Sequence, residues 1–324
     1  MIDLKSNFAE DIYAMLEFRK TMGFSTKEYI KQFKTFDRYC CELHPEETEL
    51  NEQIVLGWIR TDIPGVNVLN QRASFIRMFA KYIVSLGKNA YILPNKFVPP
   101  QKQYTPYILS DNELKQLFAL IDNYPPNGRL DPLQPALFST LFRLIYTCGL
   151  RPNEGRSLLC ENVNLDTGEI IIKETKKHKD RIVVMSEDMK NLMRKFSRLR
   201  NSYQPESPYF FPSKKGFPYT VKMLDWHFKN FLIKLYSDMN FKEIPNIRIY
   251  DLRHRFATTV MQKWINEKRD LYNALPYLST YMGHAHFSST AYYIHLLPDN
   301  LKNSDGINWE TMGEIIPEVL PWKE

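Results

Sequence analysis

Two arginines stand in segments whose neighbouring residues suit contact with a phosphate. Arg151 lies in CGLRPNEG, after one predicted helix has ended and directly before the proline that begins the next. The positive N-terminal end of that helix is therefore expected beside its guanidinium, and a solubilising surface role explains this position poorly. A guanidinium can donate to two oxygens of one phosphate at once. Arg253, in YDLRHRFAT, opens another predicted helix and suggests the same ligand independently.

A third basic segment, ETKKHKDRIVV, falls at the predicted tip of a β-hairpin. Like charges crowded at one tip repel each other, which destabilises the hairpin unless an anion lies nearby. Each of these side chains taken alone is more often a solvated surface charge. The hairpin therefore favours an anionic ligand without identifying which residue contacts it. The residues concerned are Lys176, Lys177, Lys179 and Arg181.

The stretch HAHFSSTAYYIH, residues 284–295, permits three interpretations. Its three histidines could hold a metal, but no carboxylate or cysteine stands beside them, so no metal site is predicted. Ser288 and Ser289 could cap a helix, because serine is favoured at that position. A tyrosine of the stretch could instead attack phosphorus, which is compatible with a capped helix. The two arginines that suggest a phosphate favour this last interpretation.

Composition limits the class of protein to which these segments belong. The chain has 324 residues, 44% hydrophobic and 25% charged, which is ordinary for a globular protein and long enough for two domains. No apolar run is long enough to cross a membrane, and the first residues lack the layout of a signal peptide. Four cysteines without paired CxxC spacing predict free thiols, neither a disulfide framework nor structural zinc. A cytoplasmic protein is expected.

The first hundred residues are predicted to be helical and basic. Ser25 to Glu28 has the form of a capping box, and apolar residues then recur at steps of four and three. Residues 71–88 repeat this pattern with a basic face opposite the apolar one. From residue 54 to 104 seven basic residues oppose one acidic residue, which equals the net charge of +6 of the whole chain. A solvated face is the usual role of such a basic surface, and the concentrated charge favours a polyanionic partner such as DNA equally. The residues expected to contact DNA are Arg72, Arg77, Lys81, Lys88, Lys96 and Lys102.

A segment with four prolines, residues 94–109, reads as an extended linker, and Ser110 with Glu113 forms a second capping box behind it. Beyond it the pattern predicts helices around a small antiparallel sheet of at most three strands. Gly149 is placed to end a helix. The fold class predicted is mainly α with a small antiparallel β-sheet. Strands are expected over 169–175 and 181–186, and helices over 132–148, 187–201, 220–238, 252–268, 270–282 and 288–297.

The segments GLRPNE, TKKHKDR, DLRHRFA and MGHAHFSSTAYYIH, in this order and at these separations, resemble the signature of the tyrosine recombinases, the phage integrase family. The helical basic first domain and the linker resemble the rest of that family's architecture. The resemblance implies a core-binding domain that clamps DNA (1–95), a linker (96–108), an α+β catalytic domain (109–300) and a tail (301–324). The tail either folds back onto its own domain or packs on a neighbouring protomer, as the family implies.

The resemblance also implies roles for single residues. Arg151 and Arg253 hold the scissile phosphate, and Glu154 supports the first of them. Lys176 is the hairpin lysine that protonates the leaving oxygen, with Lys177 as its rival. The nucleophilic tyrosine lies nine residues after the histidine of a glycine-histidine pair. That spacing selects His284 as the histidine and Tyr293 as the nucleophile.

One position departs from the family pattern. Tyr250 stands three residues before Arg253, where the family commonly has histidine. A phenol is a poor general base at neutral pH but a capable hydrogen-bond donor. Tyr250 is therefore expected to donate to a phosphate oxygen, and proton removal is left to His284 or water. His254 is expected to be a packed structural residue.

The activity implied is site-specific DNA recombination through a 3′-phosphotyrosyl intermediate, of the type found in mobile-element integration and excision. It needs neither metal nor other cofactor. The implied partners are double-stranded DNA, further copies of the chain in a tetramer on synapsed DNA, and a second recombinase or accessory protein, at the nucleoid. Two alternatives stay open, a non-catalytic DNA-binding protein with the same fold, which Tyr250 favours, and a type IB topoisomerase. At the hairpin, Lys177, Lys179 and Arg181 are expected to contact DNA.

Overall fold

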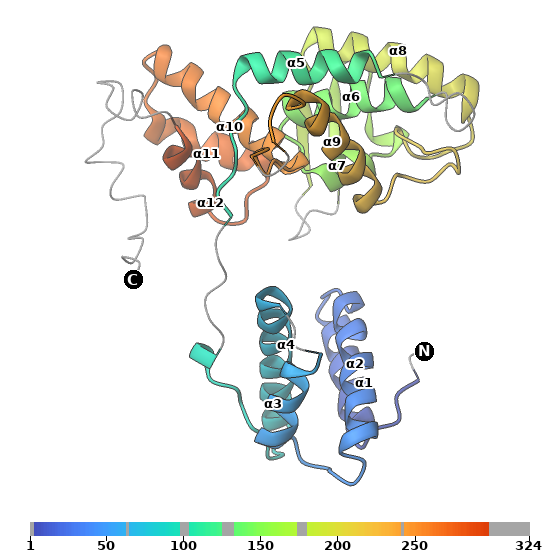
Figure 1. Cartoon of the computed structure of the whole chain (residues 1–324), viewed down its shortest axis with the longest axis vertical. Coiled ribbons are helices and arrows are strands. Elements are labelled where there is room, and N and C mark those ends of the chain that lie inside the picture. Colours follow the sequence, from blue (N-terminus) through green and yellow to red (C-terminus); the bar gives the residue numbers. More distant parts are fainter. Residues whose placement is uncertain are drawn as a thin grey trace. The chain divides into compact units, whose positions relative to one another are not determined.

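A computed structural model describes residues 3–62, 65–97, 104–124, 133–173, 180–240 and 243–297. The chain divides into two compact units, Met1–Tyr104 and Thr105–Glu324. The division falls within the expected linker, of which residues 98–103 lie outside the described residues, as does the expected tail. None of the described helices is both long and apolar enough to span a bilayer. Figure 1 shows the helices of each unit, coloured along the sequence.

The described residues of the first unit form a bundle of four helices, drawn in blue and blue-green in Figure 1. Its core is aromatic: the ring of Phe33 lies 4.6 Å from that of Phe75 and 5.1 Å from that of Phe79, both edge to face. Such contacts explain the helical spacing of apolar residues, because the buried stripe of one helix meets those of the others. The helices are α1 (Ala9–Thr21), α2 (Lys27–Leu43), α3 (Glu52–Arg60) and α4 (Val66–Ser85), followed by the 3-10 turn η1 (Asn95–Phe97).

The capping box predicted at Ser25 is wrong. Helix α2 begins at Lys27 after Thr26, which has helical backbone angles and whose side chain makes no capping bond. An N-cap normally needs extended backbone angles for its side chain to reach back to the first turn. Asn51 satisfies this requirement in α3, since its Oδ1 accepts from the Ile54 amide at 3.0 Å.

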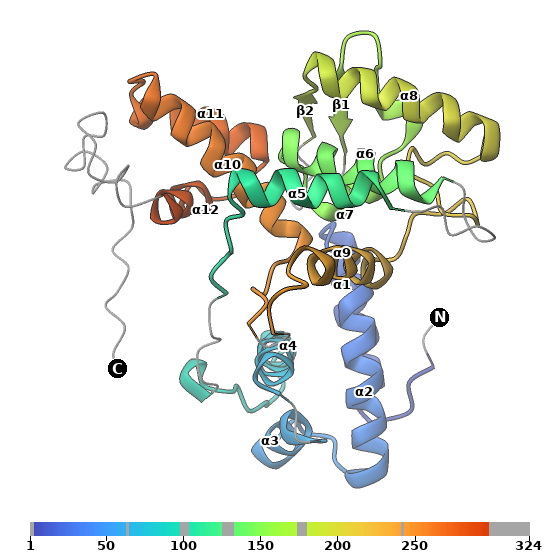
Figure 2. The same ribbon diagram turned by 45° about the horizontal axis from the view of Figure 1, so that its top comes forward.

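The second unit is mainly helical with a two-stranded antiparallel sheet, as the sequence predicts (Figure 2). Strand β1 (Glu169–Ile172) pairs with β2 (Arg181–Val184), and a third segment adds only the single bridge between Val163 and Ile170. The other elements are α5 (Asp111–Asp122), α6 (Gln134–Thr147), α7 (Pro152–Arg156), η2 (Cys160–Asn162), α8 (Glu187–Tyr203), α9 (Val221–Leu235), α10 (Ile249–Asn266), α11 (Leu271–Met282), α12 (Ser288–Ala291) and η3 (Tyr292–Leu296).

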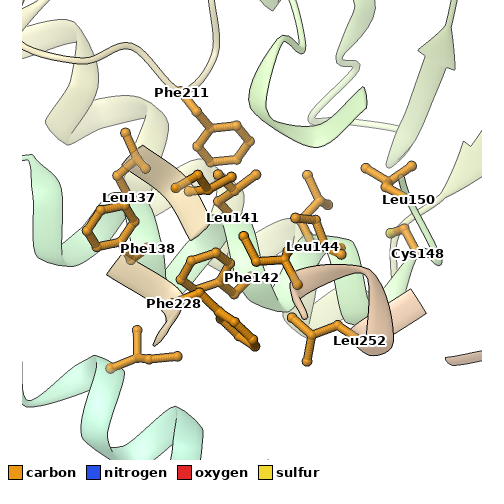
Figure 3. Packing of buried hydrophobic residues seen from close by; sticks show 14 of the residues in the cluster. Leu137, Phe138, Leu141, Phe142, Leu144, Cys148, Leu150, Phe211, Phe228 and Leu252 are labelled. Atoms are coloured by element: carbon orange, nitrogen blue, oxygen red, sulfur yellow. The ribbon is translucent and has the colours of Figure 1, made fainter. Parts of the chain in front are cut away.

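Helix α6 runs through the core of this unit and determines where the next segment begins. Its Phe142 ring lies 5.2 Å from that of Phe228 on α9, and Figure 3 shows both among the leucines of the cluster. The helix ends before Gly149, whose φ of +61° is the left-handed value that favours glycine there. A side chain at this position would also collide with Phe256. The anchored helix and its sharp end bring Arg151 to a defined place.

The capping box predicted at the start of α5 is confirmed. Ser110 accepts from the Glu113 amide, and the Glu113 carboxylate accepts from the Ser110 amide at 2.7 Å. The same carboxylate accepts from the hydroxyls of Tyr107, at 2.7 Å, and Tyr236 of α9, at 2.6 Å. Although burial alone would raise the pKa of Glu113, these bonds lower it to about 2. The cap thereby ties the start of the unit to α9.

The helix predicted over 288–297 is shorter than expected. It consists of α12, four residues long, and the 3-10 turn η3. Neither Ser288 nor Ser289 caps it, so that prediction is wrong: the N-cap is Phe287, which has helical backbone angles and makes no side-chain bond. The turn η3 is held instead by burial, because Tyr293 and Ile294 join the apolar cluster of α10 and α11.

Candidate active site

Glu154 forms the centre of a charged cluster at the start of α7. Its Oε1 accepts from Arg151 Nη1 at 2.6 Å and from Arg181 Nη1 at 3.0 Å. Its Oε2 accepts from the Arg151 amide at 2.8 Å and from Arg181 Nη2 at 2.7 Å. Arg253 Nη1 lies 4.0 Å from the same Oε2. One carboxylate therefore contacts three arginines that come from α7, β2 and α10.

Burial alone would raise the pKa of Glu154, because a carboxylate loses its hydration there. The hydrogen bonds and charge of Arg181, followed by those of Arg151, instead lower this pKa to about 2. Glu154 is consequently ionised at neutral pH and can hold both guanidinium groups. The cluster keeps a positive excess, since three arginines surround a single carboxylate.

Arg253 is completely buried in the first half of α10. Its Nη1 donates to the carbonyl of Gly149 and its Nη2 to that of Met282, each at 2.6 Å. The Arg253 Nε has no hydrogen-bond partner among the described residues. Burial lowers the pKa of this guanidinium, which nevertheless keeps its proton at any physiological pH. A buried cation with an unused donor is suited to an anionic ligand.

The C-terminal end of α11 supplies three consecutive carbonyls to the three arginines. Arg181 Nε donates to the Tyr281 carbonyl at 2.9 Å, Arg253 Nη2 to that of Met282, and Arg151 Nη2 to that of Gly283 at 2.6 Å. These groups lack partners within a helix, and the helix dipole makes this end negative. Gly283 has a φ of +63°, which turns the chain sharply there. The helix end therefore orients all three guanidinium groups.

His284 follows this turn and is held at both ring nitrogens. Nε2 lies 3.1 Å from Arg253 Nη2, and Nδ1 lies 2.7 Å from the Thr290 hydroxyl. Because arginine can only donate, Nε2 is the acceptor and Nδ1 carries the proton. Burial and then the charges of Arg253 and Arg151 lower the pKa of His284 to about 3, so the ring is neutral at pH 7.

Tyr293 lies beside this pair, and only 2% of it is exposed. Its ring is stacked on that of His284 with centroids 5.9 Å apart, and it lies 5.4 Å from that of His254. Burial raises the pKa of Tyr293 to about 12, although the charge of Arg253 and its hydrogen bond to the hydroxyl oppose this effect. The hydroxyl is therefore protonated at neutral pH and adjacent to a cation.

Tyr250 and His254 lie one turn apart on α10. The Tyr250 ring is 6.0 Å from the Arg253 guanidinium carbon and 5.0 Å from the His254 ring. Tyr250 also lines a cavity of about 530 Å³ together with Arg151, Arg156 and other residues of α7, α9 and the start of α10. Burial, followed by nearby arginines, lowers the pKa of His254 to about 4. His254 is accordingly a packed, neutral residue.

The structure brings most of the expected site residues together. Arg151, Glu154, Arg253, His284 and Tyr293 are in mutual contact, and Tyr250 lies at the edge of the cluster. The hairpin residues Lys176, Lys177 and Lys179 lie outside the described residues. Two contributors escaped the sequence interpretation: Thr290, which orients His284, and the carbonyls at the end of α11. No residue type marks a backbone carbonyl, and the contact of Thr290 with His284 depends on the turn between them.

Arg181 was expected at the surface of the hairpin, in contact with DNA, but its side chain points into the cluster and is only 7% exposed. Along β2 the side chains of Arg181 and Val183 share the inner face, while Ile182 and Val184 are exposed. This is the two-residue alternation of a strand. Because side chains two residues apart share one face of a strand, the burial of Val183 would have indicated that Arg181 also faces inward.

Several basic residues expected to contact DNA in the first unit have partners within that unit. Arg72 donates to the Trp58 and Thr61 carbonyls at the end of α3, at 3.1 and 2.7 Å. Arg77 donates to the carbonyls of Leu93 and Pro94, and Lys88 pairs with Asp11 at 2.6 Å. Their charges remain, but their side chains also hold the fold. Lys81 and Lys96 are exposed, and Lys102 lies outside the described residues.

Comparisons with known proteins agree with this arrangement. Residues 108–299 match the model of the phage integrase family. A putative integrase/recombinase of Sinorhizobium fredii is 27% identical over 305 residues, which cover 92% of this chain and 96% of that protein. Tyrosine recombinase XerD of Rickettsia bellii is 24% identical over 302 residues, which cover 86% of this chain and 90% of that protein.

A solved structure shows the same fold. The Tn1549 transposon integrase in complex with transposon right end DNA superposes with a TM-score of 0.62 at 14% identity, covering 87% of this chain and 93% of that chain. At this level of identity the likeness concerns the fold, and the chemistry must be argued from the residues of the cluster themselves.

Proposed function

Because the chain belongs to the phage integrase family and is a tyrosine site-specific recombinase, we propose that it cleaves and rejoins DNA through a 3′-phosphotyrosyl intermediate during integration or excision of a mobile element. One observation carries this proposal: the buried Tyr293 ring is stacked on that of His284, whose Nε2 lies 3.1 Å from the buried cation Arg253, within a cluster of three arginines. An attacking hydroxyl and a phosphate-binding group are thus already adjacent.

Arg151 and Arg253 bind the scissile phosphate in this mechanism. Their guanidinium groups are oriented by Glu154 and by backbone carbonyls before DNA arrives, so little reorganisation is needed as charge develops. The Arg253 Nε, without a described partner, is a donor for one phosphate oxygen. Tyr250, at the edge of the adjoining cavity, donates its hydroxyl proton to another.

Tyr293 attacks phosphorus, so that an Oη–P bond forms and the bond from phosphorus to the 5′ oxygen breaks. Lys176, or its neighbour Lys177, gives a proton to the departing oxygen, which leaves as a 5′-hydroxyl. The Tyr293 proton passes to water, or to His284 Nε2 once a phosphate oxygen replaces this nitrogen as the partner of Arg253 Nη2. Attack on the phosphotyrosine by a second DNA end reverses these bonds and rejoins the strands.

The two units have separate tasks in this proposal. Residues 1–95 clamp double-stranded DNA with their basic surface, residues 96–108 link them to the catalytic domain (109–300), and four copies act on two synapsed duplexes, with the tail (301–324) packing between neighbours. A second recombinase or accessory protein sets direction, and the protein acts at the nucleoid. The mobile-element role is supported by the putative integrase/recombinase relative and by the shared fold of the transposon integrase.

Trapping on nicked suicide duplexes, taken from the ends of the element that encodes this protein, tests the proposal. Wild type and Tyr292→Phe should give an adduct that survives denaturing gels, and Tyr293→Phe should give none. Tyr292 is the matched control because it is the adjacent tyrosine on the same turn. Specific binding without an adduct would favour a non-catalytic DNA-binding protein. Relaxation of a supercoiled plasmid without a recombination site would favour a topoisomerase.

A further inference from the structure

Arg181 is a buried cation for which the strand-cleavage mechanism above has no task. We propose that it is a positioning residue, which orients the Arg151 guanidinium through the carboxylate they share and through the end of α11. This inference rests on the proposed function, since it assigns to Arg151 the scissile phosphate. Three features of Arg181 support this role: its bonds to Glu154, its contact with α11 and its burial away from any surface that DNA could reach.

The first feature is the sharing of Glu154. Each carboxylate oxygen accepts once from Arg151 and once from Arg181, at distances between 2.6 and 3.0 Å. Two donors on each oxygen hold the plane of the carboxylate, and this plane determines the direction of Arg151 Nη1. Without Arg181 each oxygen keeps a single donor, and the carboxylate can rotate about its side-chain bonds. The guanidinium group of Arg151 then loses its fixed direction.

The second feature is the contact with the end of α11. Arg181 Nε donates to the Tyr281 carbonyl at 2.9 Å, two residues before the carbonyl of Gly283 that accepts from Arg151 Nη2. A β-carbon on Gly283 would lie 3.0 Å from Arg181 Nη1, so the side chain packs directly on this turn. Arg181 therefore fixes both acceptors of Arg151: the Glu154 carboxylate and the Gly283 carbonyl.

The third feature is the burial of the Arg181 side chain, which leaves no surface of it for contact with DNA. Only 7% of its side chain is exposed, and each of its three side-chain nitrogens donates to Glu154 or to Tyr281. A phosphate could reach it only by breaking this network. Its effect on cleavage must accordingly pass through Arg151, which is 21% exposed.

Substitution of Arg181 measures this effect in the full chain on suicide duplexes. Arg181→Met should slow cleavage by about 10- to 100-fold, the range expected when a catalytic group is misplaced by about 1 Å. DNA affinity should stay within about threefold, because no phosphate contact is removed. Arg181→Lys restores the charge and one donor and should recover part of the rate. Equal cleavage by wild type and Arg181→Met would overturn the proposal.

Arg143→Met is the matched control. Arg143 forms a two-pronged pair with Asp122, both bonds at 2.7 Å, on α6 and away from the cluster. The Arg143→Met substitution removes an arginine–carboxylate pair of similar geometry, so a general loss of stability would appear in this variant too. Cleavage should remain at the wild-type rate. If Arg143→Met and Arg181→Met were equally slow, the effect of Arg181 would be structural and the proposal wrong.

A substrate whose scissile phosphate carries no charge distinguishes the positioning role of Arg181 from the proposed function. Replacing one oxygen of the scissile phosphate by a methyl group removes the negative charge that Arg151 stabilises. On this methylphosphonate substrate, the deficit of each variant is the factor by which it cleaves more slowly than wild type. The deficits of Arg151→Met and Arg181→Met should both shrink by at least about tenfold. If the deficit of Arg151→Met alone became smaller, the positioning role would be overturned and the proposed function would stay intact. Relief for neither variant would contradict the phosphate role of Arg151 itself, and with it both proposals.

The pH dependence of cleavage supplies a readout that a structural role would not move. With Arg181 present the pKa of Glu154 is about 2, so the ionised carboxylate holds Arg151 at every working pH. Without it, burial raises this pKa, and the acceptor is lost as pH falls through the new value. Arg181→Met should therefore lose more of its rate than wild type and Arg143→Met as pH falls, while these two change equally. Parallel profiles for all three proteins would contradict the proposal.

Discussion

At the scale of single residues, the cluster consists of groups whose protonation states are determined by burial and by one another. Glu154 is ionised with a pKa of about 2, His284 is neutral with a pKa of about 3, and Tyr293 is protonated with a pKa of about 12. None of these three values lies near neutral pH. The resting cluster therefore holds fixed positive charge and a protonated Tyr293 hydroxyl, which in the proposed mechanism suits binding of a phosphate before any proton moves.

Tyr250 occupies the position where the family commonly has histidine, and its hydroxyl can be tested alone. Tyr250→Phe keeps the ring against Arg253 and should slow cleavage by about tenfold, the value of one hydrogen bond to a charged oxygen. Single-turnover rates on suicide duplexes measure the change, with DNA affinity as the control. Tyr250→His should cleave at least as fast as Tyr250→Phe. Equal rates for wild type and Tyr250→Phe would remove the proposed role of the hydroxyl.

At the scale of elements, the end of α11 is the scaffold of the site. Its last carbonyls accept from Arg181, Arg253 and Arg151, three residues that are distant in sequence. The left-handed turn at Gly283 exposes these carbonyls and sends the chain on to His284. The element thus couples the positions of Arg151 and Arg253 to that of His284.

Gly283→Ala should damage both stability and cleavage. A β-carbon is strained at a φ of +63° and would also press on the Arg181 guanidinium at 3.0 Å. The free energy of unfolding, from urea denaturation, should fall by about 1–3 kcal/mol. Gly216→Ala is the control, since φ is +78° but the nearest atom to the added carbon is 3.7 Å away.

Both glycine variants should lose stability because both adopt left-handed backbone angles. Only Gly283→Ala should also cleave more slowly, since Gly216 does not contact the arginines. If Gly283→Ala lost no more cleavage activity than Gly216→Ala, the end of α11 would not be needed to orient these groups.

At the scale of the whole molecule, each unit has a hydrophobic core of its own. Buried residues of α1 to α4 form one cluster, and those of the second unit form two others. The arginine cluster belongs entirely to the second unit, whereas the sequence concentrates positive charge near the end of the first. In the proposed function, cleavage therefore takes place in the second unit, and the basic surface of the first contributes to DNA binding.

Residues 1–104 should fold without the rest of the chain, because their core is complete within them. We expect cooperative unfolding with a free energy of about 5–10 kcal/mol, as for other small domains. Trp58 is the single tryptophan of this fragment and is 1% exposed, so its fluorescence reports the transition. Circular dichroism of the same samples is the control. Gradual unfolding, or transitions that differ between the two signals, would contradict an independent unit.

From the sequence alone, both strands, most helices of the second unit and most of the residues that the structure brings into the cluster could be predicted. The spacing of Ser110 and Glu113 predicts their capping box, and Gly149 predicts the end of α6, because these signals act within one turn of helix. The predictions failed where residues of suitable type adopted helical backbone angles instead, as at Thr26 and at Ser288 and Ser289, which lie within α12. Side-chain type alone does not determine those angles.

Only the tertiary structure decided how the arginines are held. It turned Arg181 inward toward Glu154, gave Arg72 and Arg77 carbonyl partners, and buried Tyr293 against α10. A charged side chain in a sequence predicts a charge but not its direction, since this depends on which strand face or helix end it meets. Backbone carbonyls carry no residue-type signal at all, and at this site they orient three guanidinium groups.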